Sequence, residues 1–263
     1  MSITGILTAA LLIGAIGLLT GLFLGVAAIK FKVQVDEKEE AVLAALPGNN
    51  CGGCGYPGCS GLAAAIAKGE AAVNACPVGG EAVGKVISGI MGVEAGESVH
   101  KVAFVHCKGD CSKTTLAYEY SGVEDCRVLP FVPGGGAKSC DYGCLGFGSC
   151  VKACPFDAIH VENGIAVVDK EKCRACGKCI EACPKKLISL VPYEAKHIVT
   201  CSSKDKGPVT MKACTTGCIG CGLCKKACPV DAITVVDFHA VIDQEKCIGC
   251  GACKEKCPKD AII

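Results

Sequence analysis

Residues 218–229 read CIGCGLCKKACP, and residues 247–258 read CIGCGACKEKCP. The same spacing, Cys-x2-Cys-x2-Cys-x3-Cys-Pro, recurs in CRACGKCIEACP at residues 173–184. In iron–sulfur proteins with this spacing, three neighbouring thiolates bind one 4Fe–4S cluster and the fourth Cys binds the other cluster of a pair. The proline lacks an N–H and turns the chain away from the cluster. The spacing therefore predicts small modules built around iron–sulfur clusters.

A shorter unit, Cys-x3-Cys-Pro, shows how these runs pair along the chain. Its last cysteines are 29 residues apart within a pair (154 to 183 and 228 to 257) and 45 apart between pairs (183 to 228). We therefore expect two tandem bacterial-ferredoxin-like modules at 140–190 and 215–263, separated by an insertion at 191–214. Between the units of the first module, residues 159–168 carry Asn-Gly between two apolar runs, which predicts a β-hairpin. The matching stretch of the second module, 233–243, is expected to form a hairpin likewise. The fold class predicted is α+β, in small modules organised by metal.

In each module we expect crossed ligation, in which the Cys before proline binds the cluster of the other run. Two modules with two clusters each then give four clusters. The regular ligand sets are Cys154 with Cys173, Cys176 and Cys179; Cys257 with Cys218, Cys221 and Cys224; and Cys228 with Cys247, Cys250 and Cys253. The remaining set is irregular and consists of Cys140, Cys144 and Cys150, closed by Cys183. Zinc is a weak alternative for the regular runs, because zinc sites do not require a third Cys at this spacing or a Cys-Pro.

A further cysteine group lies nearer the N-terminus. Cys51, Cys54 and Cys59 fall within CGGCGYPGC, and Cys76-Pro77 follows. Four cysteines with glycine at the tight positions and no histidine predict a fifth 4Fe–4S cluster, with zinc as a stronger alternative here than elsewhere.

Five cysteines remain, namely Cys107, Cys111, Cys126, Cys201 and Cys214. A sixth cluster could use the first three with either Cys201 or Cys214, and free buried thiols are the alternative. Cys107 and Cys201 each follow an apolar run, 102–105 and 198–199, and these runs are expected to pair. His106 and His197 lie nearby and are expected to be hydrogen-bonded rather than to ligate metal.

Composition excludes other classes of function. The 263 residues carry 27 Lys and Arg against 26 Asp and Glu, a balance that gives no electrostatic basis for binding nucleic acid. With no Trp and 12 Phe and Tyr, a single large core is not expected. The chain has no Gly-x-Gly-x-x-Gly after a strand and no phosphate-binding loop, so we expect no flavin, no NAD and no complete active site of its own.

The first 29 residues contain no charged side chain, and residues 3–29 at ~1.5 Å each would span ~40 Å as a helix. Lys30 and Lys32 follow, which predicts a single-pass anchor in the inner (cytoplasmic) membrane with the bulk of the chain on the cytoplasmic side. Thiols stay reduced there, which argues against disulfides. The expected order is an anchor (1–29), a connecting helix (30–46), an N-terminal 4Fe–4S domain (47–97) and a connecting segment (98–139) that ends in a glycine linker at 133–136.

An N-terminal span, the CGGCGYPGC segment with Cys76-Pro77, the 140–155 region and two ferredoxin-like modules together resemble the B subunit of Rnf complexes. The resemblance covers nearly the whole chain. It implies an electron-transfer subunit that exchanges electrons with soluble ferredoxin and relays them to other membrane and peripheral subunits of an ion-translocating ferredoxin:NAD oxidoreductase. A related interpretation is a membrane-anchored polyferredoxin that reduces a redox regulator or another oxidoreductase. A zinc-rich scaffold is the non-redox alternative.

Overall fold

The structure, a computed structural model, describes residues 3–30, 36–96 and 99–263, and within the first helix it describes the side chains at 7, 11–27, 29 and 30. The helices are α1 (Ile3–Lys30), α2 (Glu37–Ala45), α3 (Cys59–Ala67), α4 (Gly80–Met91), α5 (Ser149–Lys152), α6 (Lys178–Ala182), α7 (Gly207–Ala213), α8 (Leu223–Ala227) and α9 (Ala252–Glu255). The strands are β1 (Lys101–Val105), β2 (Ile159–Glu162), β3 (Ile165–Val168), β4 (Ile188–Pro192), β5 (Ile233–Val236) and β6 (His239–Ile242). Two short 3-10 segments are η1 (Leu129–Phe131) and η2 (Pro133–Gly135).

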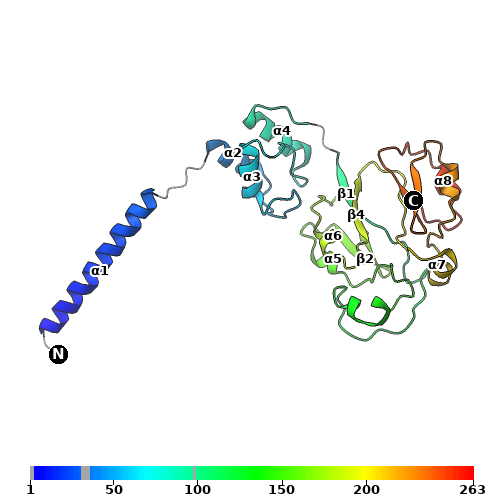
Figure 1. Cartoon of the computed structure of the whole chain (residues 1–263), viewed down its shortest axis with the longest axis horizontal. Coiled ribbons are helices and arrows are strands. Elements are labelled where there is room, and N and C mark those ends of the chain that lie inside the picture. Colours follow the sequence, from blue (N-terminus) through cyan, green and yellow to red (C-terminus); the bar gives the residue numbers. More distant parts are fainter. Residues whose placement is uncertain (1–2, 31–35, 97–98) are drawn as a thin grey trace.

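Helix α1 extends away from the cysteine-rich modules (Figure 1). Its apolar side chains are exposed, with Leu11 at 72% and Phe23 at 75%. Within the described part of the chain, no helix is both long and apolar enough to cross a membrane. The single-span anchor predicted from the sequence is therefore not confirmed.

Helices α2, α3 and α4 form the N-terminal module around a small core. Val42 and Ile87 are fully buried, and Leu62 and Ile66 are 1% exposed. The Asp36 side chain caps α2 by accepting a hydrogen bond from the Lys38 N–H at 3.0 Å. The predicted connecting helix therefore packs into the N-terminal module, because Val42 has to be covered. Residues 31–35 of that prediction lie outside the described residues.

Strand β1 makes the segment 98–139 part of the first ferredoxin-like module. It pairs antiparallel with β4, and Val102 lies opposite Val191. The predicted pairing of 102–105 with 198–199 is wrong, because Val199 instead bridges to Ile262. A five-residue ladder with buried side chains on both strands satisfies more backbone groups than a two-residue run can.

The glycine-rich stretch 133–136 is packed rather than free. A Cβ on Gly136 would lie 2.5 Å from Leu145 Cδ2, and the Tyr118 hydroxyl donates to the Pro133 carbonyl at 2.8 Å. The stretch predicted as a linker therefore contacts neighbouring residues at Pro133 and Gly136. The glycines instead allow the chain to lie against the first module.

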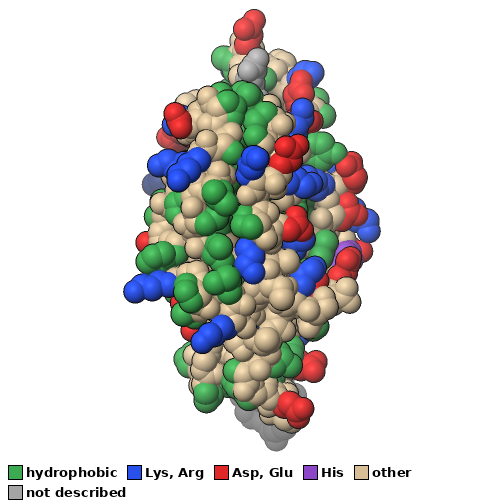
Figure 2. All heavy atoms as spheres, turned by 90° about the vertical axis from the view of Figure 1, so that its right-hand side faces the viewer, with side chains coloured by type: hydrophobic (Ala, Val, Ile, Leu, Met, Phe, Trp, Pro, Cys, Tyr) green, Lys and Arg blue, Asp and Glu red, His purple; other side chains and the backbone are tan. Residues whose placement is uncertain are grey.

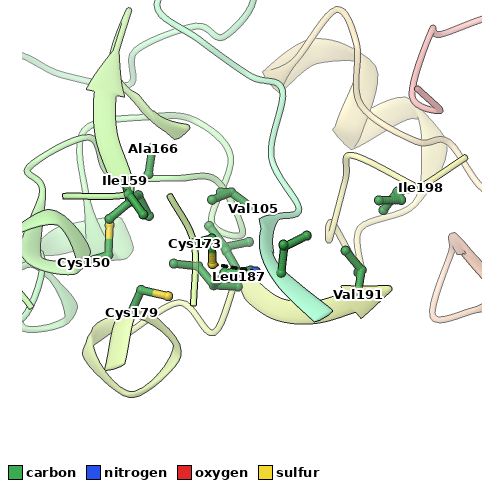
Figure 3. Close-up of a cluster of buried hydrophobic side chains, with 13 residues drawn as sticks. Val105, Cys150, Ile159, Ala166, Cys173, Cys179, Leu187, Val191 and Ile198 are labelled. Carbon is green, nitrogen blue, oxygen red and sulfur yellow. Dashed lines mark hydrogen bonds between the residues drawn. The ribbon is translucent and has the colours of Figure 1, made fainter. Parts of the chain in front are cut away.

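Both predicted hairpins are present, as β2–β3 and β5–β6. Asn163 and Gly164 form the first turn with φ of 47° and 77°, typical of a type I′ turn. The core beside β2 mixes Ile159 and Leu187 with the side chains of Cys150, Cys173 and Cys179 (Figure 3). Cysteines therefore take positions that larger apolar side chains occupy in an ordinary core.

Candidate metal centres

The second module brings its cysteines to two pockets, four to each. The first encloses about 390 Å³ and is lined by Cys218, Cys221, Cys224 and Cys257. The second encloses about 290 Å³ and is lined by Cys228, Cys247, Cys250 and Cys253. In each pocket the Cys before proline comes from the other run, and this is the juxtaposition that crossed ligation requires.

In the two ferredoxin-like modules, each Cys-Pro sulfur accepts a hydrogen bond from the backbone N–H four residues later. The four bonds are Ala158 to Cys154 at 3.5 Å, Leu187 to Cys183 at 3.4 Å, Ala232 to Cys228 at 3.3 Å and Ala261 to Cys257 at 3.3 Å. The residue before each donor is left-handed, with φ of 48° to 52°; these residues are Asp157, Lys186, Asp231 and Asp260. That turn aims the next N–H back at the sulfur. Such N–H···S bonds are among the features that set cluster potentials.

The first module gathers Cys154 with the run that starts at Cys173; we name these the regular group (Cys154, Cys173, Cys176 and Cys179). Burial, and then the charges of the other three thiols, raise the pKa of Cys179 to about 12. The Ala103 N–H on β1 donates to Cys173 Sγ at 3.3 Å (Figure 3). Strand β1 thus supports a thiol 70 residues further along the chain.

The irregular group differs from its prediction. Its pocket encloses about 400 Å³ and is lined by Cys126, Cys144, Cys150 and Cys183. Cys126 takes the place expected for Cys140. The Cys126 N–H donates to Ser149 Oγ at 3.0 Å, and Ser149 Oγ donates to Asp125 Oδ1 at 2.7 Å. These bonds hold Cys126 beside Cys150, a long-range placement that no local spacing indicates.

Cys140 lines another pocket, of about 350 Å³, with Cys107, Cys201 and Cys214. We name these four cysteines the junction group. Cys111, which was predicted to belong with Cys107 and Cys126, lines none of these four pockets. It is exposed, and its N–H donates to the Asn163 carbonyl at 2.9 Å.

In the N-terminal module, Cys76 is buried near Cys54 and Cys59. Burial is the main cause that raises the pKa of Cys76, and the charges of these two thiols add to it. The Gly79 N–H donates to Cys76 Sγ at 3.4 Å. Asn50 Oδ1 accepts a hydrogen bond from the Cys59 N–H at 2.8 Å, which fixes the start of α3.

The N-terminal module docks on the regular group through Gly53. A Cβ on Gly53 would lie 2.7 Å from the Cys176 carbonyl oxygen. Burial raises the pKa of Cys176, and the charge of Cys51 raises it further. Two cysteines expected to serve different clusters are therefore close neighbours.

The histidines near these pockets are engaged in hydrogen bonds. His106 Nδ1 lies 2.8 Å from the Val199 carbonyl oxygen, so it donates, and Nε2 lies 2.7 Å from Ser189 Oγ. Burial lowers the pKa of His106. His197 Nδ1 lies 2.8 Å from the Ile263 carbonyl oxygen. Both side chains make hydrogen bonds, as expected from the sequence.

The donor chemistry of these pockets matches iron–sulfur clusters. Among residues 3–30, 36–96 and 99–263, no three His, Cys, Asp or Glu side chains converge closely enough to hold one metal ion. The cysteines are instead spread around four open pockets, four to each. Four soft thiols with N–H groups aimed at their sulfurs are the surroundings in which 4Fe–4S clusters are bound.

Comparison with known proteins agrees with this chemistry. A family model for an Fe–S cluster matches residues 46–78. Models for a 4Fe–4S dicluster domain match 138–184, 172–232 and 217–261. The chain therefore contains ferredoxin-like 4Fe–4S domains of mixed helix and strand content.

The chain is 49% identical over 208 residues to the B subunit of the Na(+)-translocating ferredoxin:NAD(+) oxidoreductase complex of Acetobacterium woodii. That match covers 79% of this chain and 62% of the relative, less than two thirds of its length. The B subunit of the ion-translocating oxidoreductase complex of Methanosarcina acetivorans is 44% identical, with 89% of both chains covered. The B subunit of the proton-translocating ferredoxin:NAD(+) oxidoreductase complex of Clostridium ljungdahlii is 41% identical, with 77% of this chain and 72% of the relative covered. The chain belongs to the family of B subunits of Rnf-type ion-translocating oxidoreductase complexes.

Proposed function

We propose that this chain is the multi-cluster iron–sulfur subunit of a membrane-bound ferredoxin:NAD oxidoreductase that translocates ions. In this role it exchanges electrons with soluble ferredoxin and relays them to other subunits. The observation that carries the proposal is the crossed gathering of four cysteines around each pocket of the second module. When bound, 4Fe–4S clusters would supply one-electron transfer. The chain's own residues supply thiolates, N–H donors to sulfur and partial burial.

The proposed ligands form five groups. They are the N-terminal group (Cys51, Cys54, Cys59 and Cys76), the regular group, the irregular group with Cys126 in place of Cys140, and the two groups of the second module. The contact of Gly53 with Cys176 supports a route from the N-terminal module into the first ferredoxin-like module.

The second module offers a docking surface for soluble ferredoxin. Cys221 and Cys250 are exposed, whereas Cys224 and Cys253 are buried. Ile248, which lies between Cys247 and Cys250 in the sequence, is 62% exposed. The face that includes this module mixes Lys and Arg with Asp, Glu and apolar side chains, and neither sign of charge dominates (Figure 2). We propose that apolar contact around Ile248 brings a partner close to the exposed thiols.

Docking can be tested with the substitution Ile248→Glu. It should slow reduction of the anaerobic protein by reduced ferredoxin, because a charge would have to be desolvated at the contact. Val86→Glu is the matched control, since Val86 is 55% exposed on α4 of another module. Equal reduction rates in both variants and the wild type would rule out this surface.

We further propose that α1 anchors the chain in the inner membrane, with the bulk on the cytoplasmic side. Support comes from the uncharged, exposed apolar side chains of α1 and from Lys30 in its last turn. The protein should stay in the membrane fraction after alkaline carbonate extraction, and Leu18→Lys combined with Leu22→Lys should release it. Extraction of the wild type by carbonate would contradict the anchor.

The proposed redox function is tested by iron and acid-labile sulfide counts and EPR on the anaerobically purified full chain. We expect a brown protein with several 4Fe–4S signals on reduction and oxidation of reduced ferredoxin by the intact complex. A colourless protein that contains zinc would overturn the proposal. Electron delivery to a redox regulator, with no NAD-linked activity of the complex, would point to the regulatory alternative.

A further inference from the structure

We propose that the junction group, Cys107, Cys140, Cys201 and Cys214, binds a sixth 4Fe–4S cluster between the two ferredoxin-like modules. The inference rests on the proposed iron–sulfur function of the chain. It assigns to a cluster four cysteines that lie far apart in the sequence and that no repeat unit contains.

Four separate segments carry these cysteines to one pocket. Cys107 follows β1, Cys140 lies shortly before Cys144 of the irregular group, Cys201 lies in the insertion 191–214, and Cys214 ends α7. Together they line one open pocket, as four cysteines do at each of the other three pockets. The pocket thus has the same number of thiols as the proposed cluster sites in the two modules.

Polar hydrogens are directed at the sulfurs of the junction group. The Cys144 N–H donates to Cys107 Sγ at 3.3 Å, and the Ser203 N–H donates to Cys201 Sγ at 3.5 Å. Thr216 Oγ1 lies 3.6 Å from Cys214 Sγ. N–H···S bonds of this kind also occur in the regular and irregular groups and in the second module, where they favour the thiolate form that iron requires.

A buried lysine lies next to the pocket. Lys138 is 8% exposed, and its Nζ donates to the carbonyl oxygens of Gly109 and Gly164 at 3.0 and 2.9 Å. Within the described part of the chain it forms no ion pair with Asp or Glu. A buried ammonium without an anion is costly. A cluster held by four thiolates would supply negative charge beside it.

The junction group contacts a proposed ligand on each side. Cys107 accepts its hydrogen bond from Cys144, a member of the irregular group. Cys218, a member of the second module, lies close enough to Cys201 to influence the pKa of its thiol. A cluster here would connect the two modules, so that electrons could pass through neighbouring clusters between the second module and the N-terminal module.

The test is an iron and sulfide count on the anaerobically reconstituted full chain. Six clusters predict about 24 irons in the wild type and about 20 in Cys214→Ala, whose other five groups are intact. Cys111→Ala is the matched control, since Cys111 is an exposed thiol outside the pocket, and it should keep about 24 irons. If Cys214→Ala fails to fold, Cys107→Ser, which keeps a small polar side chain, is used in its place.

Double variants test which cysteines share a cluster. Cys107→Ala with Cys140→Ala should lose about four irons, because both changes affect one cluster, whereas Cys140→Ala with Cys150→Ala should lose about eight. A wild type with about 20 irons, unchanged in Cys214→Ala, would overturn the sixth cluster and leave the proposed function intact. A wild type with about eight irons or fewer would overturn the proposed function itself.

Discussion

The contact between Gly53 and the backbone of Cys176 predicts that a larger residue at position 53 weakens docking of the N-terminal module on the first ferredoxin-like module. In Gly53→Ala the new Cβ would lie 2.7 Å from the carbonyl oxygen of Cys176, and 3.0 Å from its carbonyl carbon and Cα. All three atoms belong to the backbone of a proposed ligand loop, so no flexible side chain can move aside. Gly53 is not among the residues with positive φ, so alanine suits its own backbone. The substitution should therefore destabilise the contact between the two modules and not the local backbone at residue 53.

Overpacking of this kind costs about 1–3 kcal/mol. The clash exists only in the docked arrangement, so the docked population should fall by about 5- to 150-fold relative to the undocked one. Hydrogen exchange should then accelerate by up to this factor in peptides that cover 49–56 and 172–178. Electron transfer between the N-terminal group and the regular group should slow in parallel, because Cys51 and Cys176, which lie close together, would separate.

Gly89→Ala is the matched control for this experiment. A Cβ on Gly89 would meet nothing within 4 Å, and Gly89 lies within α4 of the same module. Alanine should stabilise that helix by about 0.5–1 kcal/mol and leave docking unchanged. If Gly53→Ala kept the exchange rates and the electron-transfer rate of the wild type, the reasoning from this contact would be refuted.

Three further predictions concern charge, ligation and pH. Lys138→Met should lower the free energy of unfolding by about 1–3 kcal/mol in chemical denaturation, because two buried carbonyls lose their donor, and a redox titration should show one potential shifted downward. Cys183→Ser should alter the EPR signal of the irregular group and spare the regular group, while Cys154→Ser should do the reverse; identical effects would contradict crossed ligation. Burial raises the pKa of Cys140 to about 12 and of Cys201 to about 11, from 9.0. The folded iron-free chain therefore binds more protons than the unfolded chain above pH 9, so its urea midpoint should fall as pH rises from 9 towards 12.

The amino-acid sequence alone determined the features that depend on short spacings. Two-residue gaps between cysteines place three thiols on one loop, and a repeat of 29 residues pairs the loops into modules. Asn163-Gly164 between apolar runs specified a hairpin turn for the same reason, since a residue and its near neighbours decide the local backbone. The histidines beside the pockets make hydrogen bonds, as expected.

Only the tertiary structure decided contacts between distant segments. It placed Cys126 in the irregular group through Ser149, and it moved Cys140 to the junction group. It paired β1 with β4 and packed both α2 and the glycine-rich stretch 133–136 against neighbouring elements. In each case the partners are far apart in the sequence, and which of them meet depends on how whole elements bury their apolar faces. Spacing carries no information about that choice, because many distant cysteines are chemically equivalent until packing brings four of them around one pocket.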